Sequence, residues 1–501
     1  MESISAKNYR SILDSGEIRV CPLTVIVGKN SAGKSSFVRL LPLLKQTLER
    51  KISDTLLWYG DYVDFGDYLH TVSKKRMDEP IEIGFSIMTH GERVLGRYLK
   101  KNDDKEFLVN IRLVIREKYI EKVFLKFFDQ CVTINMNSNG NTTILINGDE
   151  NPLGKKRLYA VRETGNIIPT FFESVENGGE HYVARGLDIK DIVSYCKEYI
   201  YVDKGKRESV YNLPFYKVLD FEVNSKEEIL ERLKKVNATK FNKMNVNHKR
   251  FQKINNYIIA AKLMDIIEKI NTSVSNDLKQ TSYLKPIRAM VNRYYRVQGI
   301  SIDELDADGS NLPMILKNMT FSELRDFESW SKEKFGVIFS VALGEGHISL
   351  IIKNEVGGAE ETNVADTGYG YSQMLPIVML LWMIHSGKNI SYYDKQRTIV
   401  IEQPELHLHP AYQAKMIDVF VNVINEAEKN GITIKIIFET HSETMVNRIG
   451  TLISENKIKP EKVNVLIFDK NNEETIIESK KFDEDGLLLG WPIGFFATEE
   501  E

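Results

Sequence analysis

The chain alternates between stretches with the two-residue period of strands and stretches with the 3.6-residue period of helices. Residues 23–27 form a short, β-branched apolar run, which is typical of a buried strand. A glycine-containing loop follows, and after it one apolar helical face is formed by Phe37, Leu40, Leu41, Leu44 and Leu48. The pattern therefore predicts a strand, a loop and a helix in direct succession over residues 23–48.

Alternation of apolar and polar residues marks two other stretches, residues 1–20 and about 80–170. Residues 1–20 predict a hairpin with a turn at residues 14–16. Short alternating strands recur from about residue 80 onward, and examples are residues 81–85, 123–127 and 143–146. We expect this region to form an antiparallel sheet.

Helical periodicity replaces the alternation between about residues 186 and 280. The apolar residues that carry this periodicity are Ile229, Leu230, Leu233, Ile254, Ile258, Ile259, Leu263, Ile266 and Ile267. Beyond it, the apolar strands 398–401, 434–438 and 463–468 alternate with helical stretches, as in a parallel sheet buried on both faces. The helical region therefore interrupts an α/β pattern, and we interpret it as an insertion.

These changes of pattern predict an α/β fold in four regions. They are an N-terminal lobe over residues 1–72, an antiparallel β subdomain over 73–185, a helical insertion over 186–280 and a C-terminal lobe over 281–501. We expect a mixed or largely parallel sheet with flanking helices in the two lobes. The insertion is a candidate surface for a partner protein or DNA.

The composition is that of an ordinary globular protein. Of 501 residues, 42% are hydrophobic and 27% are charged. No apolar run approaches the ~20 residues that cross a bilayer, and the first residues lack the basic and apolar parts of a signal peptide. Cys21, Cys131 and Cys196 are far apart and have no metal-binding spacing. We therefore expect a cytoplasmic protein without a membrane segment or a disulfide framework.

Basic residues are concentrated in one segment, although the formal net charge of the whole chain is −3. The segment 232–253 contains no acidic residue, and its basic residues are Arg232, Lys234, Lys235, Lys240, Lys243, Lys249, Arg250 and Lys253. Such a segment can contact a phosphate backbone or an acidic partner. It can equally be the solvated face of a helix, and the sequence leaves both interpretations open.

The loop after the first buried strand is a complete phosphate-binding motif. Residues 28–35 fit the pattern G-x-x-x-x-G-K-[ST], and the expected cradle consists of Gly28, Lys29, Asn30, Ser31, Ala32, Gly33, Lys34, Ser35 and Ser36. Backbone N–H groups and the start of the helix converge on a triphosphate in such a loop. We expect Lys34 to reach the β- and γ-phosphates and the Ser35 hydroxyl to ligate magnesium, so the expected cofactors are ATP and Mg²⁺.

An acidic residue ends the apolar strand 398–401, as in a Walker B motif. This residue, Glu402, is expected to hold Mg²⁺ through its water shell. His407 and His409, together with Glu405, allow zinc binding as an alternative interpretation. Their i, i+2 spacing beside a proline differs from the helical H-E-x-x-H pattern, which makes zinc the weaker interpretation.

Two further segments place polar residues where a nucleotide site needs them. His441 follows the strand 434–438 and is a candidate to contact the γ-phosphate and sense its loss, with a structural histidine as the alternative. Gly370, Ser372 and Gln373 precede an apolar helix, and a helix start is a second anion site. We interpret this second site as serving the nucleotide of a partner subunit, with a simple helix cap as the alternative.

Together these motifs resemble the ABC-type ATPase head of transporter, SMC and Rad50 proteins. Within that group the chain most resembles the AAA15/OLD-like ATPases of bacterial anti-phage systems. The matching segments are residues 8–11, 28–36, 43–46, 283–288, 368–373, 401–410, 439–443 and a tail that includes 491–496. The resemblance covers roughly residues 1–72 and 281–501. It implies a head-to-head dimer or higher homo-oligomer in which Gly370, Ser372 and Gln373 contact the partner's ATP.

The chain departs from the family pattern at two places. Gln403 stands where transporter-type heads carry the catalytic glutamate, and an amide cannot act as a general base. Either Glu405 takes that role, or hydrolysis is slow and the protein is a clamp held by ATP. Residues 368–373 also differ from the strict Leu-Ser-Gly-Gly-Gln signature, so their contact in trans is inferred from position. The catalytic candidates are therefore Glu405, Gln403 and His441.

The resemblance suggests two functions. OLD nucleases add a C-terminal Toprim domain, but only about sixty residues follow His441, so we expect no nuclease in this chain. The leading hypothesis is an ATPase that scaffolds and gates a separate effector nuclease, as in PARIS (Toprim partner) and Septu (HNH partner). The alternative is a DNA-clamping repair ATPase of the Rad50/RecF type that uses residues 232–253. A transporter ATPase is a weaker hypothesis, because the sequence predicts no membrane segment.

Overall fold

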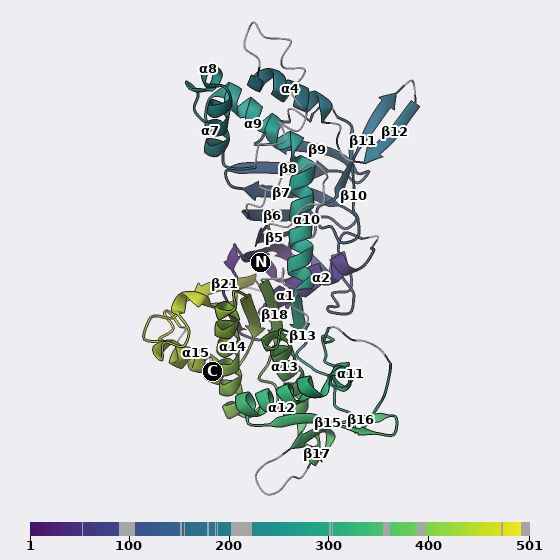
Figure 1. Cartoon of the computed structure of the whole chain (residues 1–501), viewed down its shortest axis with the longest axis vertical. Helices are drawn as coiled ribbons and strands as arrows, with labels where there is room; N and C mark the ends of the chain where they lie inside the picture. The colour runs from purple at the N-terminus through teal and green to yellow at the C-terminus, as the bar shows by residue number, and fades with distance from the viewer. Residues whose placement is uncertain are drawn as a thin grey trace. The chain divides into compact units, whose positions relative to one another are not determined.

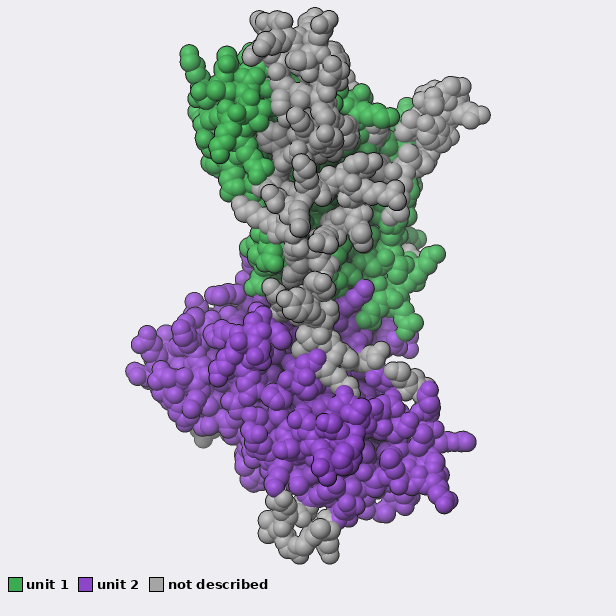
Figure 2. Space-filling model, viewed as in Figure 1, with its two compact units in different colours: residues 1–9, 47–57, 66–276 green, residues 10–46, 58–65, 277–501 purple. Residues whose placement is uncertain are grey.

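The computed structural model describes residues 1–52, 54–89, 106–150, 153–154, 156–177, 180–185, 187, 189–201, 223–299, 302, 304–353, 361–387, 396–471 and 474–491. The chain forms two compact units, each assembled from several stretches of sequence (Figure 2). Unit 1 comprises residues 1–9, 47–57 and 66–276, and unit 2 comprises residues 10–46, 58–65 and 277–501. The predicted β subdomain and the predicted insertion therefore share one unit. Residues 202–222 of the insertion and 492–496 of the tail lie outside the described residues.

Unit 1 contains the antiparallel sheet that the alternation predicts. Its strands follow the order β12-β11-β10-β9-β8-β7-β6-β5-β1, and β5 to β9 lie one after another in Figure 1. Their bounds are β1 (Ser3–Tyr9), β5 (Ile81–Met88), β6 (Leu108–Ile115), β7 (Ile120–Phe127), β8 (Gln130–Met136), β9 (Asn141–Ile146), β10 (Leu158–Val161), β11 (Thr170–Asn177) and β12 (Glu180–Arg185). The first strand pairs with β5, with Ala6 opposite Ile83, so residues 3–9 belong to this sheet. The hairpin expected in residues 1–20 is divided into three short strands: β1, β2 (Ile12–Asp14) and β3 (Ile18–Arg19).

Unit 1 also contains helices, and a buried network of side-chain amides holds one of them on the sheet. The helices are α3 (Tyr68–Thr71), α4 (Lys190–Tyr201), α7 (Lys226–Val236), α8 (Ala238–Phe241), α9 (Lys249–Ala261) and α10 (Leu263–Lys279), of which α10 begins in this unit. The side chains of Gln130 on β8 and Asn255 on α9 exchange two hydrogen bonds of 3.0 and 2.8 Å. Asn147 donates to Gln130 at 2.9 Å and to Asn256 at 2.8 Å. Since buried amides are costly when unpaired, this network fixes α9 on the sheet.

Unit 2 is built around a six-stranded sheet, as far as the described residues show, with the order β13-β18-β19-β4-β20-β21. The bounds are β4 (Leu23–Gly28), β13 (Thr281–Leu284), β18 (Gln396–Glu402), β19 (Thr433–Glu439), β20 (Val463–Asn471) and β21 (Glu474–Lys480). All neighbouring pairs are parallel except β20 and β21. The parallel sheet predicted from the apolar runs is therefore confirmed, and so is the mixed α/β class.

Helices and a smaller sheet complete the core of unit 2. The helices are α1 (Lys34–Val38), α2 (Leu40–Glu49), which begins in this unit, α11 (Leu312–Asn318), α12 (Phe321–Phe335), α13 (Tyr369–His385), α14 (Pro410–Lys429) and α15 (Glu443–Ser454), with short 3₁₀ turns at Val364–Asp366 and Pro460–Lys462. The smaller sheet contains β14 (Tyr295–Arg296), β15 (Ile338–Gly344), β16 (His347–Lys353) and β17 (Glu361–Asn363). One buried apolar cluster joins the main sheet to these helices, with Val25, Phe420 and Phe438 among its members. This core holds the polar ends of the parallel strands in fixed positions.

Candidate nucleotide-binding site

Three strand ends lie side by side in unit 2 because β19 is hydrogen-bonded to β4 on one side and to β18 on the other. In the register of these strands, Glu439 is opposite Ile26 of β4 and Glu402 of β18. Ligands of open parallel sheets bind beyond the carboxyl ends of the strands. The phosphate loop, Glu402 and Glu439 therefore meet at the edge where such a ligand binds.

The phosphate loop has a shape that only glycine permits at two of its positions. Gly28 has φ 154°, and a Cβ there would lie 2.1 Å from the carbonyl oxygen of Phe468. Gly33 has φ 93°, and a Cβ there would lie 2.8 Å from Ser11 Oγ and 2.9 Å from Thr475 Oγ1. Neighbouring chain segments thus pack closely against the loop at both glycines, which leaves no space for a side chain there.

Lys34 lies inside this loop. Its ammonium group donates to the carbonyl oxygens of Gly28 at 2.8 Å and Lys29 at 2.7 Å. Burial lowers the pKa of Lys34, while the negative charges of Glu439 and Glu405 act in the opposite direction. The predicted phosphate-binding lysine is therefore held at the loop by weak neutral acceptors, which an anionic phosphate can replace.

Ser35, the predicted magnesium ligand, is paired with a carboxylate that the sequence reasoning gave no role. Its hydroxyl donates to Glu439 Oε1 at 3.0 Å, and Glu439 Oε2 is buried without a hydrogen-bond partner among the described residues. Burial, followed by the charge of Glu402, raises the pKa of Glu439 to about 7. An unpartnered oxygen beside a serine hydroxyl fits a hard cation, since Mg²⁺ prefers oxygen ligands. The only signal in the sequence was the position of Glu439 at a strand end.

Glu402, the predicted Walker B acid, is buried and held by two side chains. Arg39 donates from Nε and Nη2 to its two oxygens at 2.7 and 2.8 Å, and Tyr283 donates to Oε1 at 2.5 Å. This pairing raises the pKa of Arg39 against the effect of its burial, and burial raises the pKa of Tyr283. Each carboxylate oxygen has two lone pairs, so Glu402 can still accept from the water shell of a cation.

The catalytic candidates lie in the turn after β18 and at the end of β19. Gln403 has φ 44°, and its backbone N–H donates to the carbonyl oxygen of Glu439 at 2.8 Å. Oε1 of Glu405 accepts from the backbone N–H of His441 at 2.7 Å, whereas Oε2 is buried without a partner among the described residues. Burial raises the pKa of Glu405 and lowers that of His441, and the charge of Lys34 lowers the latter further. The structure therefore brings Glu405 and His441 together beside Lys34.

Arg288 is a further member of this group, and the sequence reasoning assigned no role to it. It follows β13 and is only 1% exposed. Its Nη2 donates to the carbonyl oxygen of Glu402 at 3.0 Å, but Nε and Nη1 have no partner among the described residues. Burial lowers the pKa of Arg288 to about 10, against the opposing charges of Glu405 and Glu402. A buried guanidinium thus lies next to the candidate catalytic turn.

The side chains expected to act in trans on a partner's ATP, Ser372 and Gln373, make hydrogen bonds within their own chain. Ser372 and Gln373 are both 5% exposed, and Ser372 Oγ donates to the carbonyl oxygen of Tyr369 at 2.8 Å. Gln373 bonds to the backbone of Arg288. These two side chains therefore do not face outward, because both make their hydrogen bonds within their own chain. Gly370 approaches the turn after β18, where a Cβ would lie 2.9 Å from the carbonyl oxygen of His407.

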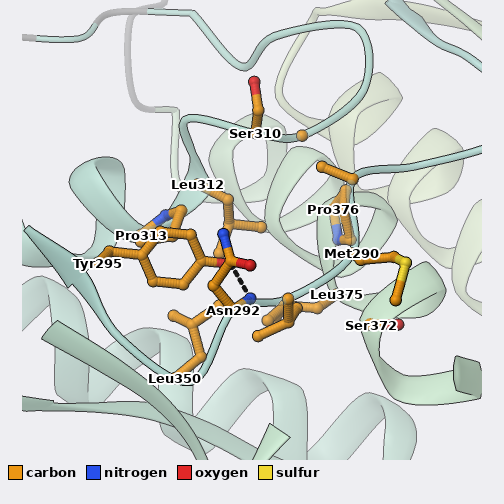
Figure 3. Close-up of a pocket in the computed structure, with 13 residues that line it drawn as sticks. Met290, Asn292, Tyr295, Ser310, Leu312, Pro313, Leu350, Ser372, Leu375 and Pro376 are labelled. Atoms are coloured by element: carbon orange, nitrogen blue, oxygen red, sulfur yellow. Dashed lines mark hydrogen bonds between the residues drawn. The ribbon is translucent and has the colours of Figure 1, made fainter. Parts of the chain in front are cut away.

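A small cavity lies between α13 and the segment that follows Arg288 (Figure 3). Its volume is about 100 Å³, and its walls include Met290, Tyr295, Leu375 and Pro376. Figure 3 shows Ser372 at the same wall of helix α13 as Leu375 and Pro376. Pockets that bind small molecules have volumes of roughly 300–1,000 Å³. The cavity is therefore too small for a nucleotide.

The histidines of the zinc alternative have other contacts. The ring of His407 lies 5.8 Å from that of Tyr369, and His409 Nδ1 accepts from the N–H of Ala411 at the start of α14. Within the described ranges, no group of three His, Cys, Asp or Glu residues is arranged to hold a metal ion. The structure therefore gives zinc no support.

The basic segment 232–253 belongs to unit 1, whereas the strand ends described above belong to unit 2. Five of its basic residues are exposed: Lys235, Lys243, Lys249, Arg250 and Lys253. Lys253 lies over the ring of Tyr195 at 5.2 Å, and Tyr195 stacks on Tyr257 at 4.0 Å.

Among the helices that the structure describes, none is long and apolar enough to cross a membrane.

A family model described as AAA ATPase domain matches residues 1–446. Similar solved structures include an SMC head bound to the C-winged helix domain of ScpA, with 10% identity, 96% and 98% of the two chains covered and a TM-score of 0.36. Two others are an Smc head domain bound to the C-terminal domain of ScpA from Pyrococcus furiosus (12% identity, 95% and 95% covered, TM-score 0.34) and the SMC head domain from Thermotoga maritima (9%, 95% and 97%, 0.32). None of the curated proteins matches the chain significantly. At TM-scores this low the structural likenesses carry no conclusion, so the family match is the informative finding.

Proposed function

The chain belongs to the family of AAA ATPase domains, and from this premise we propose that it hydrolyses ATP in the presence of Mg²⁺. The observation that supports this most directly is the 3.0 Å hydrogen bond from Ser35 to Glu439, next to the buried ammonium group of Lys34. Glu402 is the register partner of Glu439 on the neighbouring strand. The ammonium group of Lys34 suits a triphosphate, and the Ser35 hydroxyl with the two carboxylates suits the magnesium ion that accompanies it.

Each residue has a distinct part in this proposal. Lys34 binds the β- and γ-phosphates in place of the carbonyl oxygens that it now contacts. Ser35, Glu402 and Glu439 hold the magnesium ion, which neutralises the charge that develops on the phosphates. Arg39 and Tyr283 fix the orientation of Glu402, as partners of metal-binding carboxylates commonly do.

Glu405 is the proposed general base. Its buried Oε2, which has no hydrogen-bond partner among the described residues, can accept a proton from an attacking water, and burial makes the carboxylate more basic than in solution. The amide of Gln403 orients that water but cannot take its proton. His441 contacts the γ-phosphate from the end of β19 in this scheme.

The test is equilibrium binding and steady-state turnover of Mg-ATP by the purified chain. Lys34→Ala is expected to lose both the binding and the turnover of Mg-ATP, because the phosphates lose their main cationic contact. Lys462→Ala is the matched control, since that lysine pairs with Glu428 on the surface. Binding of ATP by Lys34→Ala with wild-type affinity would overturn the assignment of the site.

For the cellular role, the proposal is a nucleotide-controlled scaffold that gates a separate effector nuclease of the Toprim or HNH type in phage defence. Its support is the resemblance of the motifs to the ATPase subunits of PARIS and Septu, together with Gln403 at the usual position of the catalytic base. Two ATPase heads are expected to pair as a homodimer or higher homo-oligomer. Co-purification with the product of a neighbouring gene, unchanged by nuclease treatment and altered by Lys34→Ala, is the expected result.

A DNA clamp of the Rad50/RecF type is the second candidate, and the exposed basic residues of 232–253 favour it. Binding through phosphates is strongly salt-dependent, and each neutralised phosphate adds about 0.9 to the slope of log affinity against log salt. A clamp therefore predicts ATP turnover stimulated by duplex DNA, with stimulation lost in Lys249→Ala/Arg250→Ala. Turnover that is indifferent to DNA at low salt would eliminate this candidate.

A further inference from the structure

Arg288 is buried in unit 2 with most of its hydrogen-bonding capacity unused. It is 1% exposed, and only its Nη2 has a partner, the carbonyl oxygen of Glu402 at 3.0 Å, among the described residues. Unpaired donors on a buried charge are costly, and most buried polar groups avoid this state. Its location beside two carboxylates therefore suggests a role beyond packing.

The backbone of Arg288 is tied to the start of helix α13. The N–H of Arg288 donates to Gln373 Oε1 at 3.0 Å, and Gln373 Nε2 donates to the carbonyl oxygen of Arg288 at 3.2 Å. This pair of bonds resembles one rung of a β-ladder, so a displacement of the first turn of α13 displaces Arg288 as well. The cavity of about 100 Å³ between Ser372, Pro376 and the segment after Arg288 leaves room for such a displacement (Figure 3).

The guanidinium of Arg288 interacts electrostatically with Glu405, the residue whose Oε2 is also buried without a partner among the described residues. The other groups that face Glu405 are the backbone N–H of His441, the Thr440 hydroxyl and the charge of Lys34. Arg288 thus connects α13 on one side with the turn that carries Glu402 and Glu405 on the other.

We propose that Arg288 is a positioning residue that couples the first turn of α13 to the carboxylates Glu402 and Glu405. A shift of the first turn of α13, where Tyr369 is 58% exposed, moves Gln373 and Arg288 and so reorients Glu405. The catalytic consequence rests on the proposed ATPase function. The mechanical link does not, because it is made by contacts within the nucleotide-free chain.

Amide hydrogen exchange of the full-length chain without nucleotide tests the link. Arg288→Met is expected to speed exchange of the His441 N–H, which donates to Glu405, and of the first turn of α13, by roughly tenfold or more. Arg162→Met is the matched control, since Arg162 is also largely buried and donates to one carbonyl oxygen, that of Thr55, but lies in unit 1. Unchanged exchange at both places in Arg288→Met would overturn the proposal.

Turnover provides the second readout. Arg288→Met is expected to lower kcat by about 10- to 100-fold with little change in ATP affinity, as loss of an orienting partner does, and Arg288→Lys is expected to recover part of kcat. Gln373→Ala is expected to lower kcat without adding to the effect of Arg288→Met, because residues of one network are not additive. Equal losses in kcat and in affinity would indicate general damage and contradict a positioning role. A wild-type chain that never hydrolyses ATP would refute the proposed function, while the exchange experiment would still decide whether Arg288 links α13 to Glu405.

Discussion

The hydroxyl of Ser35 and the carboxylate of Glu439 are joined by a 3.0 Å hydrogen bond that connects the phosphate loop to the end of β19. Glu439 is also the register partner of Glu402 on β18. The magnesium side of the candidate site therefore contains two carboxylates on adjacent strands. In the absence of a cation they repel each other, and this repulsion, added to burial, raises the pKa of Glu439 to about 7.

The raised pKa of Glu439 predicts a pH dependence of stability in the nucleotide-free protein. Between pH 4.5 and about 7 the folded protein keeps a proton that the unfolded chain releases. The stabilising contribution is therefore complete below pH 4.5 and is lost as the pH rises through about 7, by roughly 3 kcal/mol. Urea unfolding at pH 5 and pH 8 measures this loss, and Glu439→Gln is expected to remove it.

Glu443, an exposed residue at the start of α15, offers a control for this measurement. Glu443→Gln is expected to leave the pH dependence as in the wild type. A Glu439→Gln protein with the same loss of stability between pH 5 and pH 8 would show that another group is responsible.

The roles of Glu405 and Gln403 can be separated by exchanging their functional groups. Glu405→Gln is expected to lower kcat by about 10²- to 10⁴-fold while ATP still binds, because the general base is lost. Gln403→Glu is expected to change kcat little, since the base is already present in Glu405. Single-turnover hydrolysis of labelled ATP measures both, and a strong gain of activity in Gln403→Glu would assign the base to position 403 instead.

Replacing Arg39 by an uncharged residue removes the ion-pair partner of Glu402. The pair is partly buried, with Arg39 side chain 30% and Glu402 side chain 2% exposed. Arg39→Met leaves a buried carboxylate with Tyr283 as its one remaining side-chain partner among the described residues. Breaking such pairs costs about 3–5 kcal/mol when both partners are buried. We expect a loss somewhat below that range in thermal or urea unfolding, because Arg39 is partly solvated. Glu402→Gln combined with Arg39→Met is expected to recover part of it, and no recovery would contradict this explanation.

The amide network of unit 1 predicts a stability effect that leaves nucleotide chemistry unchanged. Asn255→Leu removes two hydrogen bonds of the buried Gln130 side chain, which keeps its bond from Asn147 and its bond to the carbonyl oxygen of Asn224. A cost of about 1–3 kcal/mol is expected for the two lost bonds. The measurement is hydrogen exchange in α9 together with the KM for ATP, and a changed KM would show that this helix influences the site.

Local patterns in the sequence were sufficient to predict the phosphate loop and the parallel strands. Residues 23–36 encode their own geometry, because the apolar run, the two glycines and Lys34 act within a few residues of one another. The antiparallel sheet of unit 1 was equally predictable from the alternation in segments such as 123–127. The pairing of β1 with β5 was not, since Ala6 and Ile83 are brought together only by the folded sheet.

The unpredicted parts of the site depend on contacts between distant segments. Glu439 has its role because β19 lies between β4 and β18, and this strand order is not encoded locally. Arg288 and Tyr283 reach Glu402 across more than a hundred residues of sequence. Gln373 was expected, from the resemblance, to contact the ATP of a partner subunit. In the structure it is buried by its bonds to Arg288, which no spacing rule predicts.

Because the candidate nucleotide site lies in one unit, substitutions in the other unit can change the protein's surface while the site stays the same. Every residue assigned to the nucleotide site belongs to unit 2, whereas the long stretch 66–276 belongs to unit 1. Substitutions in that stretch can alter surface charge without replacing any residue of the candidate nucleotide site. A lineage could therefore acquire a new target by recombination within this stretch and keep the same chemistry.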